Sequence, residues 1–453
     1  MASSPTPAPS ASSSSSLNRQ ILALAVPAFG ALVAEPLIVL GDTAIVGHLG
    51  TEPLAGLTLG ATVIQTVVGI MVFLSYSTTP AVARAFGAEN LQRAFTAGRN
   101  GLWVALGLGV VLAIVGWFVA EPVLRAMGAF GTTAEYGVAY LRPSLLGLPG
   151  MLLVLAAVGV LRGLQDTKTP LYVAGVGAAL NLGLSWLLVY PLGMGVAGSA
   201  VATAFIQWCM GLTMGAMVVR GMRAHSVSLL PDLPGSLSVF RVGGWLMLRT
   251  LTMRIALLST VFVVTHQGAT NLAAYQLTMT FFNFLAFALD SLAIAAQALL
   301  GKEMGTRDLS TTAGRGAVRY LKNRLVKWSL WFGVVTGLLC PVAGFWGGWV
   351  FTADPQVQHL FALAMLVVAV GQPIAAYVFI LDGVLIGAQD VRYLALASVF
   401  TLTFYAPLLA IVYFGVTDSV WAFLGIWIAY AGGYMGARAL TLGARARQDI
   451  WIK

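Results

Sequence analysis

Long apolar runs, separated by short polar segments, dominate the hydrophobic pattern of the chain. Each run is about 20 residues or longer, the length that an α-helix needs to cross the hydrocarbon core of a bilayer. Twelve spans are predicted, at 20–46, 55–82, 101–120, 137–161, 171–191, 196–219, 245–265, 272–300, 328–351, 358–386, 393–415 and 420–437. The connections at 191–195 and 266–271 are short enough to join antiparallel neighbours. The pattern predicts an all-α polytopic membrane protein.

The two halves of the chain repeat each other. "HLGTEPLAGLTLG" at 48–60 aligns with "HQGATNLAAYQLT" at 266–278, an offset of 218 residues. "GVLRGLQD" at 159–166 matches "GVLIGAQD" at 383–390 in six of eight residues. Because each half holds an even number of spans, both halves enter the membrane from the same side. We therefore expect two six-helix bundles related by a pseudo-two-fold axis along the membrane normal.

This repeat divides the chain into five predicted parts. They are a disordered tail at 1–17, an N-lobe at 18–220, an inter-lobe cytoplasmic loop at 221–244, a C-lobe at 245–440 and a cytoplasmic C-terminal tail at 441–453. The tail at 1–17 is rich in Ser, Pro and Ala and lacks the basic and apolar regions of a signal peptide.

Composition and charge support a membrane location. Hydrophobic residues make up 58% of the chain and charged residues 9%, and the mean hydropathy is +0.87. If the N-terminus is cytoplasmic, 21 of the 25 basic residues fall on the cytoplasmic side, Arg162 and Arg438 among them. Arg142, Arg249 and Arg254 instead fall within spans. The net charge of +9 is thus a topology signal, with both termini cytoplasmic, and does not indicate nucleic-acid binding.

Polar residues follow one face of the eighth span. Gln276, Asn283, Asp290 and Gln297 are spaced by seven and therefore share a helical face. Such a stripe is typical of a wall of a wet cavity. The alternative is that its amides are interhelical hydrogen-bond partners, worth about 0.6 kcal/mol each.

Four carboxylic acids lie inside spans: Glu35, Asp42, Asp290 and Asp382. The last three have repeat mates that are not acids, namely Thr260, Val72 and Val158. The scaffold is thus duplicated while the charge is not, as expected of acids placed for function.

Glu35 and Asp42 share one face of the first span, which also contains Pro27 and Pro36. Each proline removes a backbone hydrogen bond, so this helix is predicted to bend. Burial disfavours the charged form of a carboxyl, so such an acid can bind a proton or a cation in turn. The alternative is that Asp42 has only a structural role and accepts hydrogen bonds from neighbouring hydroxyl groups. Asn181, Ser185 and Thr203 are the nearby polar candidates.

The residues resemble a known family. "AVPAFGALVAEPLIVLGDTAIVGHLGTEPLAGLTLG" at 25–60 is similar to the first two helices of the multidrug and toxic compound extrusion (MATE) transporters, of the branch named for DNA-damage-inducible protein F (DinF). The segments 164–207, 272–305 and 381–395 extend the likeness.

The resemblance implies two six-helix lobes that alternate in access, driven by entry of H⁺ or Na⁺. It places the N-lobe ion and substrate site at Asp42, Asn181 and Thr203, which are also the candidate ligands of a Na⁺ ion. It places helix bending at Pro27. Where some relatives have a second Asp, this chain has Ser185, which favours H⁺ over Na⁺. Asp382 corresponds only loosely to a C-lobe cation site of other branches.

We therefore expect a monomeric antiporter of the cytoplasmic membrane that exports cationic or amphipathic compounds, with no cofactor and no enzymatic activity. One alternative is a flippase for a lipid-linked precursor, disfavoured because acids rather than bases lie deep in the spans. The other is an intramembrane protease using Asp290 and Asp382, disfavoured because its flanking motifs are missing.

Overall fold

The computed structural model describes residues 11–416 and 419–452, and within those ranges the chain is helical and contains no strand. The helices are α1 (Ala11–Gly47), α2 (Thr51–Met71), α3 (Phe73–Gly87), α4 (Leu91–Ala126), α5 (Gly131–Gly163), α6 (Lys168–Val189), α7 (Gly195–Ala224), α8 (Leu233–His266), α9 (Ala269–Thr306), α10 (Thr312–Phe351), α11 (Pro355–Gly387), α12 (Val391–Gly415), α13 (Ser419–Ile428), η1 (Ala429–Tyr434), α14 (Met435–Arg447) and η2 (Asp449–Trp451).

These elements form twelve membrane spans in the described part of the chain, which confirms the predicted number. The second span consists of α2 and α3, which meet at Val72, and the last consists of α13, η1 and α14. The segment η1 is a π-helix, a wide turn that is rare and is often found at functional sites.

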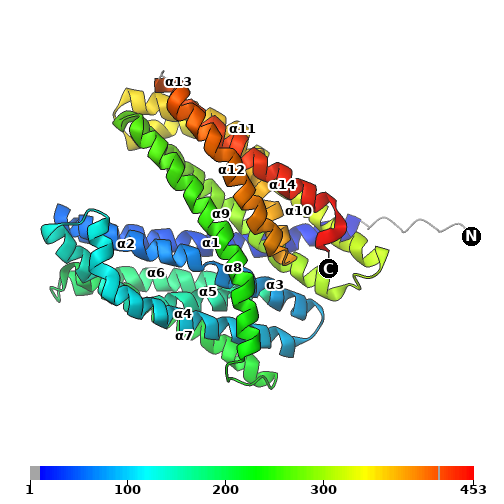
Figure 1. Ribbon diagram of the computed structural model, residues 1–453. Helices are drawn as coiled ribbons and strands as arrows, with labels where there is room; N and C mark the ends of the chain where they lie inside the picture. The colour runs from blue at the N-terminus through cyan, green and yellow to red at the C-terminus, as the bar shows by residue number, and fades with distance from the viewer. Residues whose placement is uncertain (1–10, 417–418, 453) are drawn as a thin grey trace, which may run out of the picture.

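The spans form two bundles, α1–α7 and α8–α14 (Figure 1). The bundles meet near the start of α1 and the end of α14 and diverge toward the opposite side, so that the molecule has the shape of a V (Figure 1). Contacts place the two chain ends together, since Asn18 accepts a hydrogen bond from Trp328 on α10, and Lys322 on α10 donates to the backbone oxygen of Ala446. The side that carries both ends is therefore the closed side.

The repeat is visible in the backbone. Gly50 and Gly268 precede α2 and α9 with φ of 127° and 105°, a conformation that strongly favours glycine. Gln165 and Gln389 follow α5 and α11 with φ of 68° and 60°. Both pairs fall in the sequence segments that align between the halves, so the duplication extends to the shape of individual turns.

A pair of repeat-related glycines closes the molecule on the side of its ends. Gly87 at the end of α3 lies against the backbone oxygen of Lys302 on α9, and Gly305 on α9 lies against the backbone oxygen of Arg84 on α3. A Cβ at either position would collide with the opposing backbone. Thr306 Oγ1 also donates to the Gly87 oxygen at 3.1 Å, and Gln165 Nε2 donates to the Ala298 oxygen at 3.0 Å. The two lobes thus meet backbone to backbone.

Three predicted segments are more helical than hydropathy indicated. The helix α1 begins at Ala11, within the predicted tail at 1–17, of which residues 1–10 lie outside the described residues. The expected loop at 221–244 is mostly helix, with only 225–232 between α7 and α8. The expected tail at 441–453 continues α14 to Arg447, and Trp451 beyond it is buried. Helices continue past the membrane boundary because their backbone hydrogen bonds do not depend on apolar side chains.

Candidate functional site

Asp42 on α1 is 2% exposed and lies among hydroxyl groups of two other helices. Ser185 Oγ on α6 donates a hydrogen bond to Asp42 Oδ1 at 2.8 Å. Thr203 Oγ1 on α7 donates to Asp42 Oδ2 at 2.9 Å. Asn181 lies one turn before Ser185 and contacts Asp42 only indirectly, since its Nδ2 donates to Thr203 Oγ1 at 2.8 Å. The structure therefore brings these four sequence-predicted residues into one buried cluster without a cationic side chain in it.

Close packing of α1 on α6 brings the side chain of Asp42 within hydrogen-bond distance of Ser185. A Cβ at Gly30 would lie 2.6 Å from Leu171 Cδ1, and Gly41, next to Asp42, lies directly against Leu182. Small residues at helix contacts let backbones approach closely in a membrane. The helix α1 continues through Pro27 and Pro36, each of which leaves one backbone carbonyl without its usual N–H partner.

Two buried oxygens beside Asp42 have no hydrogen-bond partner in the structure. They are Asn181 Oδ1 and Ser199 Oγ, and Ser199 lies one turn before Thr203 on α7. Buried polar atoms are nearly always paired, so these two oxygens can each accept a further hydrogen bond next to the carboxylate. The donor set of carboxylate, amide and hydroxyl oxygens is also the set that hard cations prefer.

Glu35 lies two turns before Asp42 on α1 and lines a cavity of about 240 Å³. Gln207 on α7 lies next to Glu35 in this N-lobe cavity. The far wall of the cavity contains Tyr76, Arg162 and Asp290, and Asp290 belongs to α9 of the other lobe. The N-lobe cavity thus reaches the interface between the lobes.

A second cavity of about 380 Å³ lies on the C-lobe side and shares Val72, Tyr76 and Asp290 with the first. Its C-lobe wall includes Asn283, three arginines and two tyrosines: Arg249, Arg254, Arg438, Tyr430 and Tyr434. The two cavities adjoin at the interface between the lobes, with Asp290 on their common wall.

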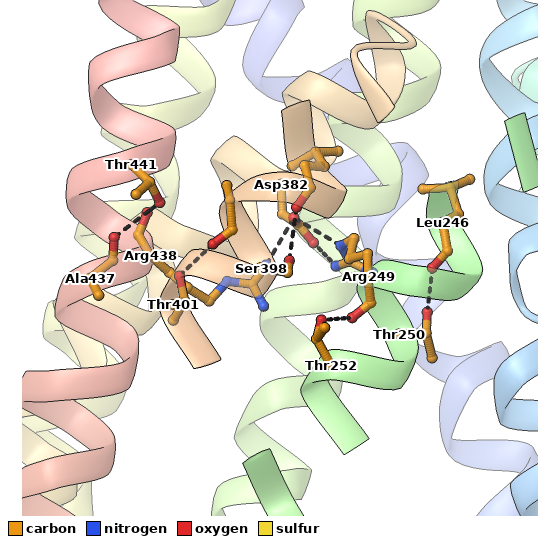
Figure 2. A network of polar contacts seen from close by, with 12 residues as sticks. Leu246, Arg249, Thr250, Thr252, Asp382, Ser398, Thr401, Ala437, Arg438 and Thr441 are labelled. Atoms are coloured by element: carbon orange, nitrogen blue, oxygen red, sulfur yellow. Dashed lines mark hydrogen bonds and ion pairs between the residues drawn. The ribbon is translucent and has the colours of Figure 1, made fainter. Parts of the chain in front are cut away.

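Asp382 is held by two guanidinium groups (Figure 2). Arg249 on α8 donates from Nε to Asp382 Oδ1 at 3.2 Å and from Nη2 to Oδ2. Arg438 on α14 donates from Nη2 to Oδ1 at 2.9 Å. All three residues are at most 7% exposed. A cation cannot share this carboxylate without displacing an arginine, so the loose correspondence to a C-lobe cation site is not supported by the contacts.

Asp290 and Asn283 line the C-lobe cavity, but Gln276 does not. Gln276 is exposed, whereas Gln297 is buried, with 2% of its surface exposed. The stripe of residues spaced by seven is therefore only partly a cavity wall. The helix turns about 700° over seven residues rather than 720°, so the stripe drifts around α9.

Sequence reasoning misplaced the bases. The charge pattern predicts Arg162 and Arg438 among the cytoplasmic charges, yet they are 8% and 3% exposed and line the central cavities. The expectation that acids rather than bases lie deep in the spans is therefore wrong. The available signal was Arg249 and Arg254 within a span, because a charged residue inside a membrane helix marks a functional site by default.

Comparison with known proteins identifies the fold and the family. The MatE family model matches residues 27–187 and 246–411, which is more than half of the chain. The chain belongs to the MatE family. DNA damage-inducible protein F of Escherichia coli (strain K12) is 28% identical over 425 residues, which cover 92% of this chain and 91% of that protein. Protein DETOXIFICATION 43 of Arabidopsis thaliana is 28% identical over 490 residues, covering 94% and 90%.

Solved structures show the same fold. The Vibrio cholerae MATE transporter VcmN in its bent form is similar with a TM-score of 0.85 at 21% identity, covering 97% of this chain and 99% of that one. A multidrug resistance MATE family transporter in an outward-facing conformation gives 0.84 at 21% identity, with 95% of each chain covered. The MatE protein described here is therefore a multi-pass membrane transporter rather than an enzyme, and its two-bundle fold is confirmed.

Proposed function

We propose that this MatE protein is a secondary active exporter. It expels cationic or amphipathic organic compounds by alternating access, in exchange for H⁺ that binds at Asp42. The observation that carries the proposal is the environment of Asp42, a buried carboxylate whose two oxygens accept hydrogen bonds only from hydroxyl groups.

An antiporter needs a site at which proton and substrate exclude each other. An ionised Asp42 attracts a cation, whereas a protonated Asp42 does not. The proton of a neutral Asp42 requires an acceptor, and the hydroxyl of Ser199, which lies next to Asp42, can supply one. Glu35, two turns away on the same helix, extends the acidic surface into the N-lobe cavity.

Proton coupling is favoured over sodium coupling. Na⁺ is held by several oxygen ligands, and a second carboxylate would strengthen such a site. Ser185 supplies a hydroxyl where a second acid would stand, which leaves Asp42 as the one carboxylate in the cluster of described residues. The oxygens of Asn181 and Thr203 still fit a cation, so Na⁺ is the alternative coupling ion that the experiment must distinguish.

The shape of the molecule supports an outward-open state. The positive-inside pattern assigns both chain ends to the cytoplasm, and the lobes are closed on that side by the Gly87 and Gly305 contacts. Exposure of the cytoplasmic side requires these backbone contacts to separate while the spread ends of the V approach each other. In this proposal the protein lies in the cytoplasmic membrane.

Asp42→Asn tests the proposal directly. In proteoliposomes with an imposed pH gradient, the purified wild-type protein should export a cationic dye. The rate of the variant should be lower by at least about 100-fold, because an amide binds no proton in the pH range of the assay. Asp354→Asn, at the start of α11 and away from both cavities, is the matched control. Full export by D42N would remove Asp42 from the mechanism.

The same assay distinguishes H⁺ from Na⁺ as the coupling ion. With Na⁺ absent on both sides, a pH gradient alone should drive export, and an Na⁺ gradient at equal pH should not. A strict requirement for Na⁺ would replace H⁺ by Na⁺ at the Asp42 cluster.

Two other functions are less well supported. The arginines of the central cavities fit an anionic cargo and so favour a flippase of a lipid-linked precursor more than the sequence did, but the matched family and its detoxification relatives favour small-molecule export. An intramembrane aspartyl protease needs two carboxyls that act together, and Asp382 is instead bound by two arginines.

A further inference from the structure

The C-lobe cavity carries an excess of positive charge. Arg249 and Arg438 are both paired to the single carboxylate of Asp382, and Arg254 adds a third guanidinium to the wall. Asp290 is the other acid of this wall, and it lies next to Arg162 and Tyr76 of the N-lobe. In formal charge, the C-lobe wall has one arginine more than it has acids.

Arg254 is that surplus arginine. Its side chain is exposed toward the cavity, and no hydrogen bond or ion pair holds it among the described residues. An arginine in the middle of a membrane helix costs about 2.5–3.5 kcal/mol on insertion scales, so an unpaired one is retained at a cost. Arg254 is on α8 of the C-lobe, yet a Cβ at Gly69 on α2 of the N-lobe would lie 2.6 Å from its Nη2. The absence of a side chain at Gly69 makes room for the guanidinium between the lobes.

The rest of the wall fits an organic molecule rather than a free ion. The π-helical turn of η1 places Tyr430 and Tyr434 in the wall, with ring centroids 5.5 Å apart and planes 12° from parallel. Met253, Met279 and Phe282 complete an apolar surface around them. The N-lobe cavity, which carries Glu35, adjoins this space through Tyr76 and Asp290. The central space is therefore acidic at one end and basic at the other.

We propose that Arg254, supported by Arg438 and Arg249, is a subsite for the carboxylate of the transported molecule, and that the preferred cargo is an amphipathic zwitterion. The planar fork of arginine matches a carboxylate in two parallel hydrogen bonds. The cationic group of the same molecule then points toward Glu35, and its aromatic body lies against Tyr430 and Tyr434. The inference rests on the proposed function and identifies the substrate class of that site.

A matched pair of dyes tests the subsite. Rhodamine B is a zwitterion with a free carboxylate, and its ethyl ester has the same cationic ring system without that charge. Equilibrium binding is measured by fluorescence anisotropy on the purified protein in detergent, which requires no ion coupling. The wild type should bind rhodamine B more tightly than the ester. Absence of that preference overturns the proposal.

Arg254→Gln should weaken binding of rhodamine B by about ten-fold, in line with the loss of charge-assisted hydrogen bonds, and should leave the ester within about two-fold. Arg254→Lys keeps the charge but not the fork, and should lie between them. Arg142→Gln, an arginine within α5 that lines neither cavity, is the matched control and should change neither dye. Equal weakening of both dyes by R254Q, or the same selectivity loss in R142Q, overturns the proposal.

Two further measurements separate the subsite from folding and from coupling. On the wild type, benzoate should displace rhodamine B and the neutral benzamide should not. This measurement needs no variant, so a folding defect cannot affect it. Equal displacement by the two compounds overturns the subsite. Asp42→Asn should keep the preference for rhodamine B over its ester while it loses proton-driven export. If D42N exports normally but R254Q still loses the carboxylate selectively, the proposed coupling fails and the subsite stands.

Discussion

Asp42 and Asp382 are both buried carboxylates on membrane helices, one in each lobe, and their neighbours differ in kind. Asp42 is 2% exposed and receives hydrogen bonds from Ser185 and Thr203. Asp382 is 7% exposed and receives them from Arg249 and Arg438. Hydroxyl groups stabilise a carboxylate without fixing its charge, because they can rotate and instead accept a hydrogen bond from the protonated carboxyl group. Guanidinium groups are always charged and hold their partner ionised.

The comparison shows that burial of an acid in a membrane does not by itself indicate ion coupling. The partners decide. In the N-lobe both carboxylate oxygens accept from hydroxyl groups, whereas in the C-lobe both carboxylate oxygens already face arginines. The two lobes are copies of one scaffold, yet only the C-lobe acid has a fixed ionic link, and the proposed exchange of charge belongs to the N-lobe acid.

The largest expected effect is on stability. Asp382→Asn leaves two buried arginines without their counter-charge, and removal of one partner of a buried ion pair costs about 3–5 kcal/mol. Asp42→Asn removes no ion pair and should cost about 1 kcal/mol or less. Thermal unfolding in detergent, followed by circular dichroism, should show a much larger loss for D382N. Replacing Asp382, Arg249 and Arg438 together by apolar residues should recover most of it, and equal losses in D382N and D42N would contradict the difference between the two sites.

The next effect is on transport. Ser185→Lys would give Asp42 the fixed cation that Asp382 already has, and a permanently paired carboxylate cannot take up a proton. Export driven by a pH gradient in proteoliposomes should fall by about 100-fold or more, equivalent to about 2.7 kcal/mol in the barrier. Ser185→Asn, which adds bulk without charge, is the control that should retain more activity. Undiminished export by S185K would mean that the charge state of Asp42 is irrelevant.

The smallest effect separates the two hydroxyls. Ser185→Ala removes one hydrogen bond to Asp42, whereas Thr203→Ala also removes the acceptor of Asn181 Nδ2. Each hydrogen bond is worth about 1 kcal/mol, so S185A should lower the rate of export by less than about ten-fold and T203A by more than S185A. The initial rate at a fixed pH gradient measures both, and the reverse order would indicate that Asn181 is not part of the cluster.

Much of the fold was predictable because its signals are local. Span length, the bias of Lys and Arg and the offset of 218 residues can each be found in short segments, and they led to the twelve spans and two bundles that the structure contains. The Asp42 cluster was partly predictable, since Asn181 and Ser185 are one turn apart on α6 and the family resemblance joined them to α1 and α7.

The C-lobe was harder to predict because its contacts are long-range. Asp382 is 133 residues from Arg249 and 56 from Arg438, and no periodicity connects them. Arg162 and Arg438 lie near helix ends, where a basic residue is ordinarily a solvated topology signal. The folded structure alone shows that these side chains are buried at the central cavities.

The π-helical turn in the last span ties the ionic link of the C-lobe to the number of residues in that span. A π-turn is an α-helix with one residue inserted, and each residue of an α-helix adds about 100° of rotation. Deletion of Gly432 from η1 would restore a regular helix and would turn the guanidinium of Arg438 away from Asp382, while every side chain of the link remained in the protein.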